Sequence, residues 1–473
     1  MPLCSLEWGG SEPSAWQGRA MSRHHVVLVP GFFGFGSLGA LTYFVGVREA
    51  LTAAFERQCL NVQIVEVPTL PTASIRHRAA RVRETLAALA DAESGPIHIV
   101  GHSTGGLDAR LAIAPTASLP TPRKFRQHER LRTLVTLCTP HFGTPLASFF
   151  GSAAGSPLLR AVSWLLVSGL KHGRFPVRFG LRLGGWFTRA DDALGLEPTV
   201  IDDFFREVIA DFSAERRAEL IAFIEGISAD QSLVFQLTPA GCDLLNAGTA
   251  DPDSLRYGSI VCRARKPRTT DLLTLTRDPY TRTMYVLYAL LHRVAGFARS
   301  AGLPEPVPAQ REVLERAFGK YPRPSWSDGI VPTLSQVWGE VIHASDADHL
   351  DVVGHYGSTR ERQRSSDWLP SRSGFDDRAF DALWTAVARF IAEEARQGAA
   401  PSHRRNVGVE RTEVEPAETH TPAPSQRGER VTATEQARQA LKEVRVAPAT
   451  QRGPHSVASP PPSRPQERGT RAS

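Results

Sequence analysis

The pentapeptide Gly101-His102-Ser103-Thr104-Gly105 constrains the fold more than any other part of the sequence. It directly follows the apolar run Pro96–Val100 and directly precedes a segment with helical composition that ends near Ile113. A sharp turn between a strand and a helix brings its flanking positions against neighbouring backbone, so those positions need glycine. The pattern predicts a strand–turn–helix unit with Ser103 raised at the bend. The alternative is a glycine-rich turn in which the serine has no chemical role.

Strands and helices alternate along the chain on either side of this turn. The expected elements are strands at His25–Pro30, Leu60–Val67, Pro96–Val100, Leu131–Cys138 and Tyr257–Ala264, and helices at Ile75–Ala92, Ser103–Ile113, Pro279–Arg299 and Phe380–Arg396. The alternation also returns around Gly329–Leu334. Strands joined by helical crossovers run parallel, so we expect an α/β fold with a mostly parallel central sheet flanked by helices.

The domain organisation follows from shifts in composition. Residues 1–22 read as a flexible N-terminal extension and residues 23–396 as a single α/β domain. Residues 145–250 interrupt the β-α rhythm and read as a lid or cap insertion, in which Leu158, Val162 and Leu166 repeat at helical spacing. An amphipathic lid helix of this kind would contact a lipid surface, although the same stripe also suits core packing. Residues 397–473 are rich in Pro, Arg, Ser and Glu and are expected to be a disordered tail.

The charge distribution argues against a nucleic-acid partner. The net charge of +6 comes mostly from residues 401–473, which carry 12 Lys and Arg against 8 Glu, so the rest of the chain is nearly neutral. No apolar run reaches the ~18 residues that a transmembrane helix needs. The N-terminus has no apolar run typical of a signal peptide, and Met21 offers a second start. We therefore expect a cytoplasmic protein without a transmembrane segment.

The five cysteines are few and widely spaced. They form no Cys-x-x-Cys pair and no Cys/His cluster with zinc spacing, so we expect no metal site of that kind. Cys242 and Cys262 could pair, but nothing in the spacing requires it, and we expect no disulfide.

A serine becomes nucleophilic only when a base takes its proton, and the base in turn needs an acid to orient it. In α/β hydrolases these follow along the chain as Ser, then Asp or Glu, then His. Beyond residue 320 the chain offers several candidates. The acids are Asp328, Asp346 and Asp348, and the bases are His349, His343 and His355. Spacing alone leaves the choice open. Two backbone N–H groups are also needed to hold the oxyanion, and Thr104 and Phe32 are the expected donors.

Several short segments, in the same order, resemble the bacterial true lipases (triacylglycerol lipases) of the α/β-hydrolase superfamily. They are Val27–Gly34, Gly101–Gly106, Thr139–Thr144, Leu237–Gly241 with Asn246 nearby, Ser327–Pro332 and His349–Asp351. The resemblance covers about residues 25–355. It implies that Asp328 is the catalytic acid, that His349 is the base, and that Phe32 and Thr104 form the oxyanion hole.

The resemblance implies a serine esterase or lipase that hydrolyses lipid-like carboxylic esters without a required cofactor. Alternatives are an acyltransferase or polyester depolymerase with the same triad, or a binding protein that has kept only the fold. The chain departs from the family by having Pro30-Gly31 where His-Gly is usual, and by lacking a recognisable signal peptide. Related lipases bind a structural calcium through the position of Asp351 and an upstream Asp, where this chain offers only Glu305.

Overall fold

The computed structural model describes residues 23–32, 43–69, 73–152, 232–268, 270–271, 279–298, 302–357 and 367–397. Within these residues six parallel strands form one sheet in the order β2-β1-β3-β4-β5-β6. The strands are β1 (His24–Val29), β2 (Val62–Glu66), β3 (Ile97–His102), β4 (Leu131–Leu137), β5 (Arg256–Arg263) and β6 (Glu340–Asp346). The chain first steps from β1 to the edge strand β2. It then returns to β3 on the other side of β1 and proceeds outward to β6.

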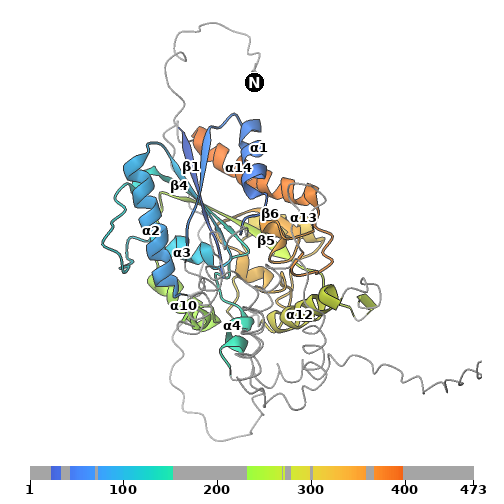
Figure 1. The fold of residues 1–473 in the computed structure, drawn as a ribbon. Helices are drawn as coiled ribbons and strands as arrows, with labels where there is room; N and C mark the ends of the chain where they lie inside the picture. Colours follow the sequence, from blue (N-terminus) through green and yellow to red (C-terminus); the bar gives the residue numbers. More distant parts are fainter. Residues whose placement is uncertain are drawn as a thin grey trace, which may run out of the picture.

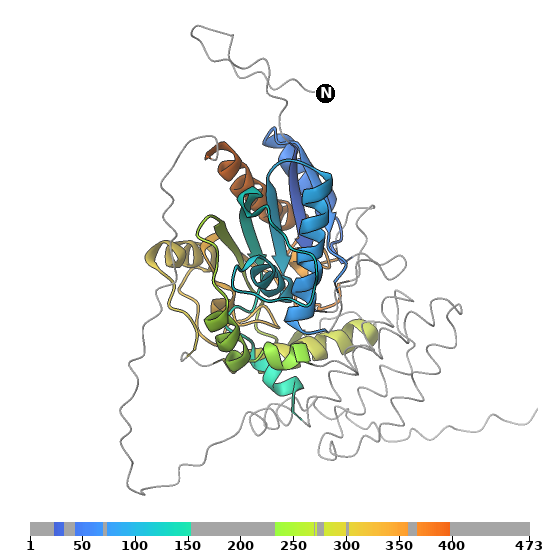
Figure 2. The ribbon, with the colours of Figure 1, turned by 90° about the vertical axis from the view of Figure 1, so that its left-hand side faces the viewer.

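Helices cover both faces of this sheet (Figure 1). α1 (Val47–Arg57) packs against α14 (Asp377–Gln397) on one face, whereas α2 (Ile75–Ala92) packs against α3 (Thr104–Ile113) on the other, as Figure 2 also shows. Right-handed crossovers place the connecting helices on opposite faces when the strand order reverses. The reversal lies between β1 and β3, where ligands of open α/β sheets bind at the carboxyl ends of the strands. This is the α/β-hydrolase fold that the sequence predicts.

The two faces of β1 belong to two separate hydrophobic clusters. Val26 and Leu28 point into a cluster that includes Trp384 of α14, while Val27 and Val29 point into one that includes Leu86 of α2. Successive side chains of a strand alternate between faces, so a strand covered on both sides must be apolar throughout. This explains why the predicted strands read as continuous apolar runs.

The remaining described helices lie at the carboxyl end of the sheet or along its β6 edge. They are α4 (Pro145–Phe150), α9 (Ser232–Gln236), α10 (Pro239–Gly248), α12 (Pro279–Ala295) and α13 (Pro308–Phe318). Short 3-10 turns occur at His128–Arg130, directly before β4, and at Thr333–Gln336 and Asp351–Val353. α12 packs against α4, and α13 packs against β6. None of the helices in the described ranges combines the length and the apolar character that crossing a membrane requires.

The predicted helix at Ile75–Ala92 is confirmed with the same bounds, and Ser74 caps its first turn. The expected return of the β-α alternation is found a few residues after Gly329–Leu334, because this segment is a tight turn and the strand β6 comes later, at Glu340–Asp346. The carboxylate of Asp328 accepts the N–H groups of Ile330 and Val331, which curls the backbone out of an extended path. Residues 1–22, most of the expected lid (153–231) and residues 398–473 of the expected tail lie outside the described residues.

The structure differs from the expectation of no disulfide at one cysteine, Cys59. Cys138, Cys242 and Cys262 are buried free thiols, so the possible pair Cys242–Cys262 does not form. Cys59, however, is disulfide-bonded, so the expectation of no disulfide is wrong. Sequence spacing carries no information on pairing, so this bond could not be predicted.

Candidate active site

Ser103 occupies a strained turn between β3 and α3. Its backbone has φ of 54° and ψ of −128°, and only 5% of its surface is exposed. A positive φ is unfavourable for a residue with a Cβ atom and persists only where the surroundings enforce it. Here the Ser103 N–H donates to the carbonyl of Leu137 on β4 at 2.8 Å, which ties the turn to the neighbouring strand.

The glycines on either side of Ser103 are required by close backbone contacts. A Cβ atom on Gly105 would lie 2.3 Å from the carbonyl oxygen of Val29 in β1. A Cβ atom on Gly101 would lie 2.6 Å from the backbone nitrogen of Gly106. The structure therefore agrees with the steric reason inferred from the sequence for both glycines.

The structure brings Ser103, His349 and Asp328 into one hydrogen-bonded line. Nε2 of His349 lies 2.9 Å from Oγ of Ser103, and Nδ1 of His349 lies 2.7 Å from Oδ2 of Asp328. All three residues are buried, with 5%, 5% and 0% of the surface of Ser103, His349 and Asp328 exposed. They come from three separate parts of the chain, which meet at the carboxyl end of the sheet.

The carboxylate of Asp328 is held in a fixed orientation. Its Oδ1 accepts the N–H groups of Ile330 at 2.9 Å and Val331 at 2.7 Å, and its Oδ2 also faces Nε2 of Gln336 at 3.2 Å. The backbone N–H of His349 donates to the Asp328 carbonyl at 3.0 Å. This leaves Oδ2 turned toward the imidazole of His349, so the acid and the base are oriented by the same turn.

The rival acids and bases lie away from Ser103. Asp346 pairs with Arg263 at the surface, and the carboxylate of Asp348 accepts a hydrogen bond from Ser371. His355 contacts the carbonyl of Tyr43 through Nε2, and His343 lies within β6. None of these four side chains has a hydrogen bond to Ser103 among the described residues.

The expected oxyanion donors lie on two segments that Arg78 holds together. Thr104 is the first residue of α3, and Phe32 follows the turn after β1. Arg78 is completely buried. Its Nη2 donates to the carbonyls of Pro30 at 2.7 Å and Gly31 at 3.0 Å, and to Oγ1 of Thr104 at 3.3 Å. The carbonyl of Gly31 and the N–H of Phe32 belong to one planar trans peptide and point in opposite directions. Arg78 therefore helps to aim the Phe32 N–H away from itself.

The buried charge of Arg78 is stabilised by the neighbouring carboxylate of Asp108. Nε of Arg78 donates to Oδ2 of Asp108 at 2.8 Å, and neither side chain is exposed. Burial raises the pKa of Asp108 to about 6, although the guanidinium of Arg78 opposes this shift. Arg78 is not among the residues predicted from the sequence, although a charged residue on the apolar stripe of a predicted helix is a recognisable signal.

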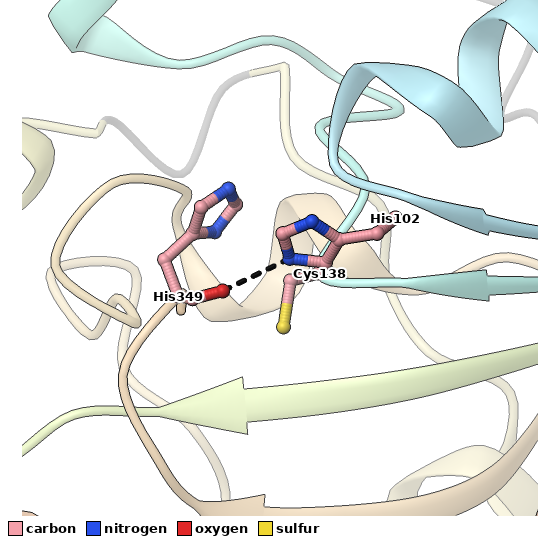
Figure 3. A group of neighbouring side chains, drawn as sticks. All are labelled: His102, Cys138 and His349. Atoms are coloured by element: carbon pink, nitrogen blue, oxygen red, sulfur yellow. Dashed lines mark hydrogen bonds between the residues drawn. The ribbon is translucent and has the colours of Figure 1, made fainter. Parts of the chain in front are cut away.

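Two further buried residues, Tyr43 and His102, connect the oxyanion turn to the base. The Gly31 N–H donates to the hydroxyl of Tyr43 at 2.9 Å, and this hydroxyl lies 2.6 Å from Nδ1 of His102. Nε2 of His102 lies 2.9 Å from the backbone oxygen of His349, as Figure 3 shows. Burial lowers the pKa of His102 well below its usual range, and the nearby His349 lowers it further, so the ring is neutral.

Three potential metal ligands converge among the described residues. Atoms of His102, Cys138 and His349 lie within 4.8 Å of one another (Figure 3). All four ring nitrogens of the two histidines already have hydrogen-bond partners. Burial also raises the pKa of the Cys138 thiol, which keeps it protonated and a poor ligand. The cluster therefore does not fit a metal ion.

The two residues at the calcium positions implied by the resemblance lie in different surroundings. Glu305 is exposed and acts electrostatically on Arg311 and Tyr321. Asp351 is buried, and the carboxylates that act on it are Asp348 and Asp367. A structural calcium site stays a prediction, and no chemical step is assigned to calcium.

Comparison with known proteins points to esterases and lipases. Residues 21–171 match the family described as "Putative serine esterase (DUF676)". A triacylglycerol lipase of Vibrio cholerae serotype O1 is 31% identical over 102 residues, which cover 21% of this chain and 31% of that protein. The match thus spans about a third of the length of this curated relative.

Among solved structures, the lipase of Staphylococcus hyicus aligns with a TM-score of 0.44 at 13% identity, covering 82% of this chain and all of that one. EstA from Clostridium botulinum aligns with a TM-score of 0.42 at 16% identity, covering 80% of this chain and 92% of its own. The family match and the curated relative are esterases or lipases, which agrees with the α/β-hydrolase fold. The narrower assignment to bacterial true lipases stays a prediction.

Proposed function

We propose that this protein is a serine hydrolase that cleaves carboxylic esters through an acyl-enzyme formed on Ser103. The observation that carries the proposal is the line from Ser103 Oγ to His349 Nε2 (2.9 Å) and from His349 Nδ1 to Asp328 Oδ2 (2.7 Å) at a strained elbow. Nucleophile, base and orienting acid are then in hydrogen-bond contact before any substrate binds.

In the first step, Oγ of Ser103 attacks the ester carbonyl while His349 takes its proton. The oxyanion accepts hydrogen bonds from the backbone N–H groups of Phe32 and Thr104. The tetrahedral intermediate then collapses, the bond from carbon to the alkoxy oxygen breaks, and His349 returns its proton to the departing alcohol. Asp328 stays ionised and stabilises the imidazolium that forms in between.

In the second step, water replaces the serine hydroxyl as the nucleophile. His349 takes a proton from the water, whose oxygen bonds to the acyl carbon, and gives it back to Ser103 Oγ as the acyl bond breaks. The products are a carboxylic acid and free enzyme. Every proton transfer uses a side chain of this protein, so the proposed reaction needs no cofactor.

The proposed substrate class is a lipid-like ester. The support is the resemblance to lipases and the presence, among the described residues, of two strongly exposed apolar side chains on neighbouring helices. Phe235 of α9 is 61% exposed and Leu244 of α10 is 77% exposed. Exposed apolar residues of this size suit transient contact with a lipid surface.

The test is hydrolysis of a panel of p-nitrophenyl esters of increasing acyl length. We expect turnover that favours longer chains, and a loss of at least about 10⁴-fold in Ser103→Ala, the size found when a triad member of a serine protease is removed. His349→Ala should lose a similar amount. The matched control is His343→Ala, a partly buried histidine of β6, which should retain wild-type turnover.

Undiminished turnover in Ser103→Ala would contradict the proposal. Product analysis with an added alcohol separates hydrolysis from acyl transfer, because a transferase would yield a new ester in place of the free acid.

A further inference from the structure

We propose that Tyr43 and His102 form a positioning pair that fixes the oxyanion turn and the base loop relative to each other. This inference rests on the proposed function, since it assigns a role within that active site. The pair links the N–H of Gly31, on the peptide before the expected donor Phe32, to the backbone carbonyl of His349.

The direction of each hydrogen bond follows from the partners. The carbonyl of His349 can only accept, so Nε2 of His102 carries the hydrogen. A neutral imidazole then has a bare Nδ1, which must accept from the hydroxyl of Tyr43. The oxygen of that hydroxyl accepts the N–H of Gly31. The chain therefore runs in one direction, from the oxyanion turn to the base loop.

The chemistry explains why these two residue types are needed. The side chain at position 43 must donate one hydrogen bond and accept another through a single atom, which a hydroxyl can do. The side chain at position 102 must accept a hydrogen bond at one atom and donate one from another, which a neutral imidazole can do. Tyr43 and His102 are both buried, so water is poorly placed to replace a lost partner. Burial also raises the pKa of Tyr43, which keeps the hydroxyl protonated and able to donate.

The Tyr43–His102 pair contacts both the oxyanion turn at Gly31 and the loop that carries the base His349. Gly31 is so close to the nucleophile that a Cβ atom on it would lie 2.6 Å from Cβ of Ser103. Arg78 holds the carbonyl of Gly31 and Tyr43 holds its N–H, so this residue is fixed from two sides. At the other end, His102 holds the carbonyl of the residue whose ring contacts Ser103 (Figure 3). Small displacements of such groups lower the rate of the chemical step.

The experiment measures kcat and KM for a chromogenic ester together with thermal stability. In Tyr43→Phe we expect kcat to fall about 10- to 100-fold, as for loss of a buried hydrogen bond that leaves its partners unpaired, while KM changes less than about twofold. His102→Phe should behave in the same way. His102→Gln keeps an N–H able to face the His349 carbonyl and should recover part of kcat.

The matched control is Tyr285→Phe. Tyr285 is also buried, and its hydroxyl also accepts a backbone N–H, that of Arg268 at 3.0 Å, while donating to Asp271 at 2.7 Å. Its removal should lower the unfolding temperature without lowering kcat. Equal losses of kcat in Tyr43→Phe and Tyr285→Phe would show a general stability effect and overturn the inference, as would wild-type kcat in folded Tyr43→Phe.

The double variant Tyr43→Phe/His102→Phe tests whether the two residues act as one unit. If they do, it loses no more than about the larger of the two single losses in kcat, whereas additive losses overturn the pair. Ser103→Ala is measured in the same series. Retained activity in Ser103→Ala overturns the proposed function, and the pair's role with it. If Ser103→Ala loses activity but Tyr43→Phe keeps the wild-type kcat, the positioning pair alone is overturned.

Discussion

Arg78 and Asp108 form a completely buried ion pair, with 2.8 Å between Nε and Oδ2, directly behind the expected oxyanion turn. The same guanidinium donates to the carbonyls of Pro30 and Gly31. One side chain thus combines a structural role, neutralising a buried carboxylate, with an orienting role at the active site. The two roles can be separated by mutation.

Arg78→Lys retains a positive charge near Asp108 but loses the planar guanidinium, whose Nε contacts Asp108 while its Nη2 contacts both carbonyls. We expect kcat to fall about tenfold with little change in KM, the effect of losing roughly one hydrogen bond in the transition state. The control is Arg110→Lys, because Arg110 is also buried and paired, with Asp251, but has no hydrogen bond to the oxyanion turn in the described structure. A larger loss of kcat in Arg110→Lys than in Arg78→Lys would contradict this role.

Arg78→Met leaves the Asp108 carboxylate buried without its partner. Breaking a buried pair in this way costs about 3–5 kcal/mol, so the urea midpoint should fall sharply. Adding Asp108→Asn should recover much of that stability while activity stays low. Recovery of full activity in the double variant would show that Arg78 does not orient the turn.

The strain at Ser103 predicts that glycine at this position is more stable than a residue with a Cβ atom. A non-glycine residue at φ of 54° and ψ of −128° costs roughly 1–3 kcal/mol, part of which glycine relieves. Ser103→Gly should therefore be more stable than Ser103→Ala, by about 1 kcal/mol in urea unfolding, although both lack the hydroxyl and both should be inactive. Equal midpoints would indicate that the turn stores no strain.

Asp328→Asn should abolish activity while leaving the turn intact. The oxygen of the amide must stay where Oδ1 now accepts two backbone N–H groups, so its NH₂ faces Nδ1 of His349. The ring then carries its hydrogen on Nε2 and cannot accept from Ser103. We expect kcat to fall about 10⁴-fold, as in the corresponding serine protease variant. Asp346→Asn, at the surface pair with Arg263, is the matched control and should be fully active.

The buried carboxyls of Asp348, Asp351 and Asp367 predict a loss of stability at higher pH. Burial raises the pKa of all three, and mutual repulsion raises it further for Asp351 and Asp367; the values for Asp348 and Asp367 are about 7 and about 8. Unfolded carboxyls ionise near pH 4, so the native state binds more protons between about pH 4 and 8. Stability contributed by these protons is present at low pH and is lost as pH rises through that window.

The measurement is the urea midpoint of wild type and Asp367→Asn at pH 5 and pH 8. A chelator is present throughout, because a bound divalent cation would neutralise the same carboxylates. The gain from Asp367→Asn should be larger at pH 8 than at pH 5. A gain that shrinks with rising pH would contradict the assignment.

Much of the fold follows from local patterns in the sequence. Continuous apolar runs mark strands buried on both faces, and the helix Ile75–Ala92 is fixed by its periodicity and its cap at Ser74. The position of the strand near Gly329–Leu334 could not be predicted, because an apolar run gives no sign that the Asp328 side chain will curl it into a turn. The strand β6 (Glu340–Asp346) is only partly buried, so its sequence is not a continuous apolar run.

The candidate site was only partly accessible from the sequence. The elbow at Ser103 is a local motif, and the family resemblance singled out Asp328 and His349 where spacing could not. Tyr43 has no local signal, because its role depends on a fold that brings it next to His102, 59 positions away. Contacts of that kind are decided by tertiary packing and do not appear in any short pattern.

The most direct test of the central claim is covalent labelling with a fluorophosphonate, followed by mass spectrometry of the digested protein. We expect one phosphonylated residue, Ser103, with labelling that is lost in Ser103→Ala and strongly slowed in His349→Ala. Wild-type protein that stays unlabelled, or a label that is found on another serine and persists in Ser103→Ala, would contradict it.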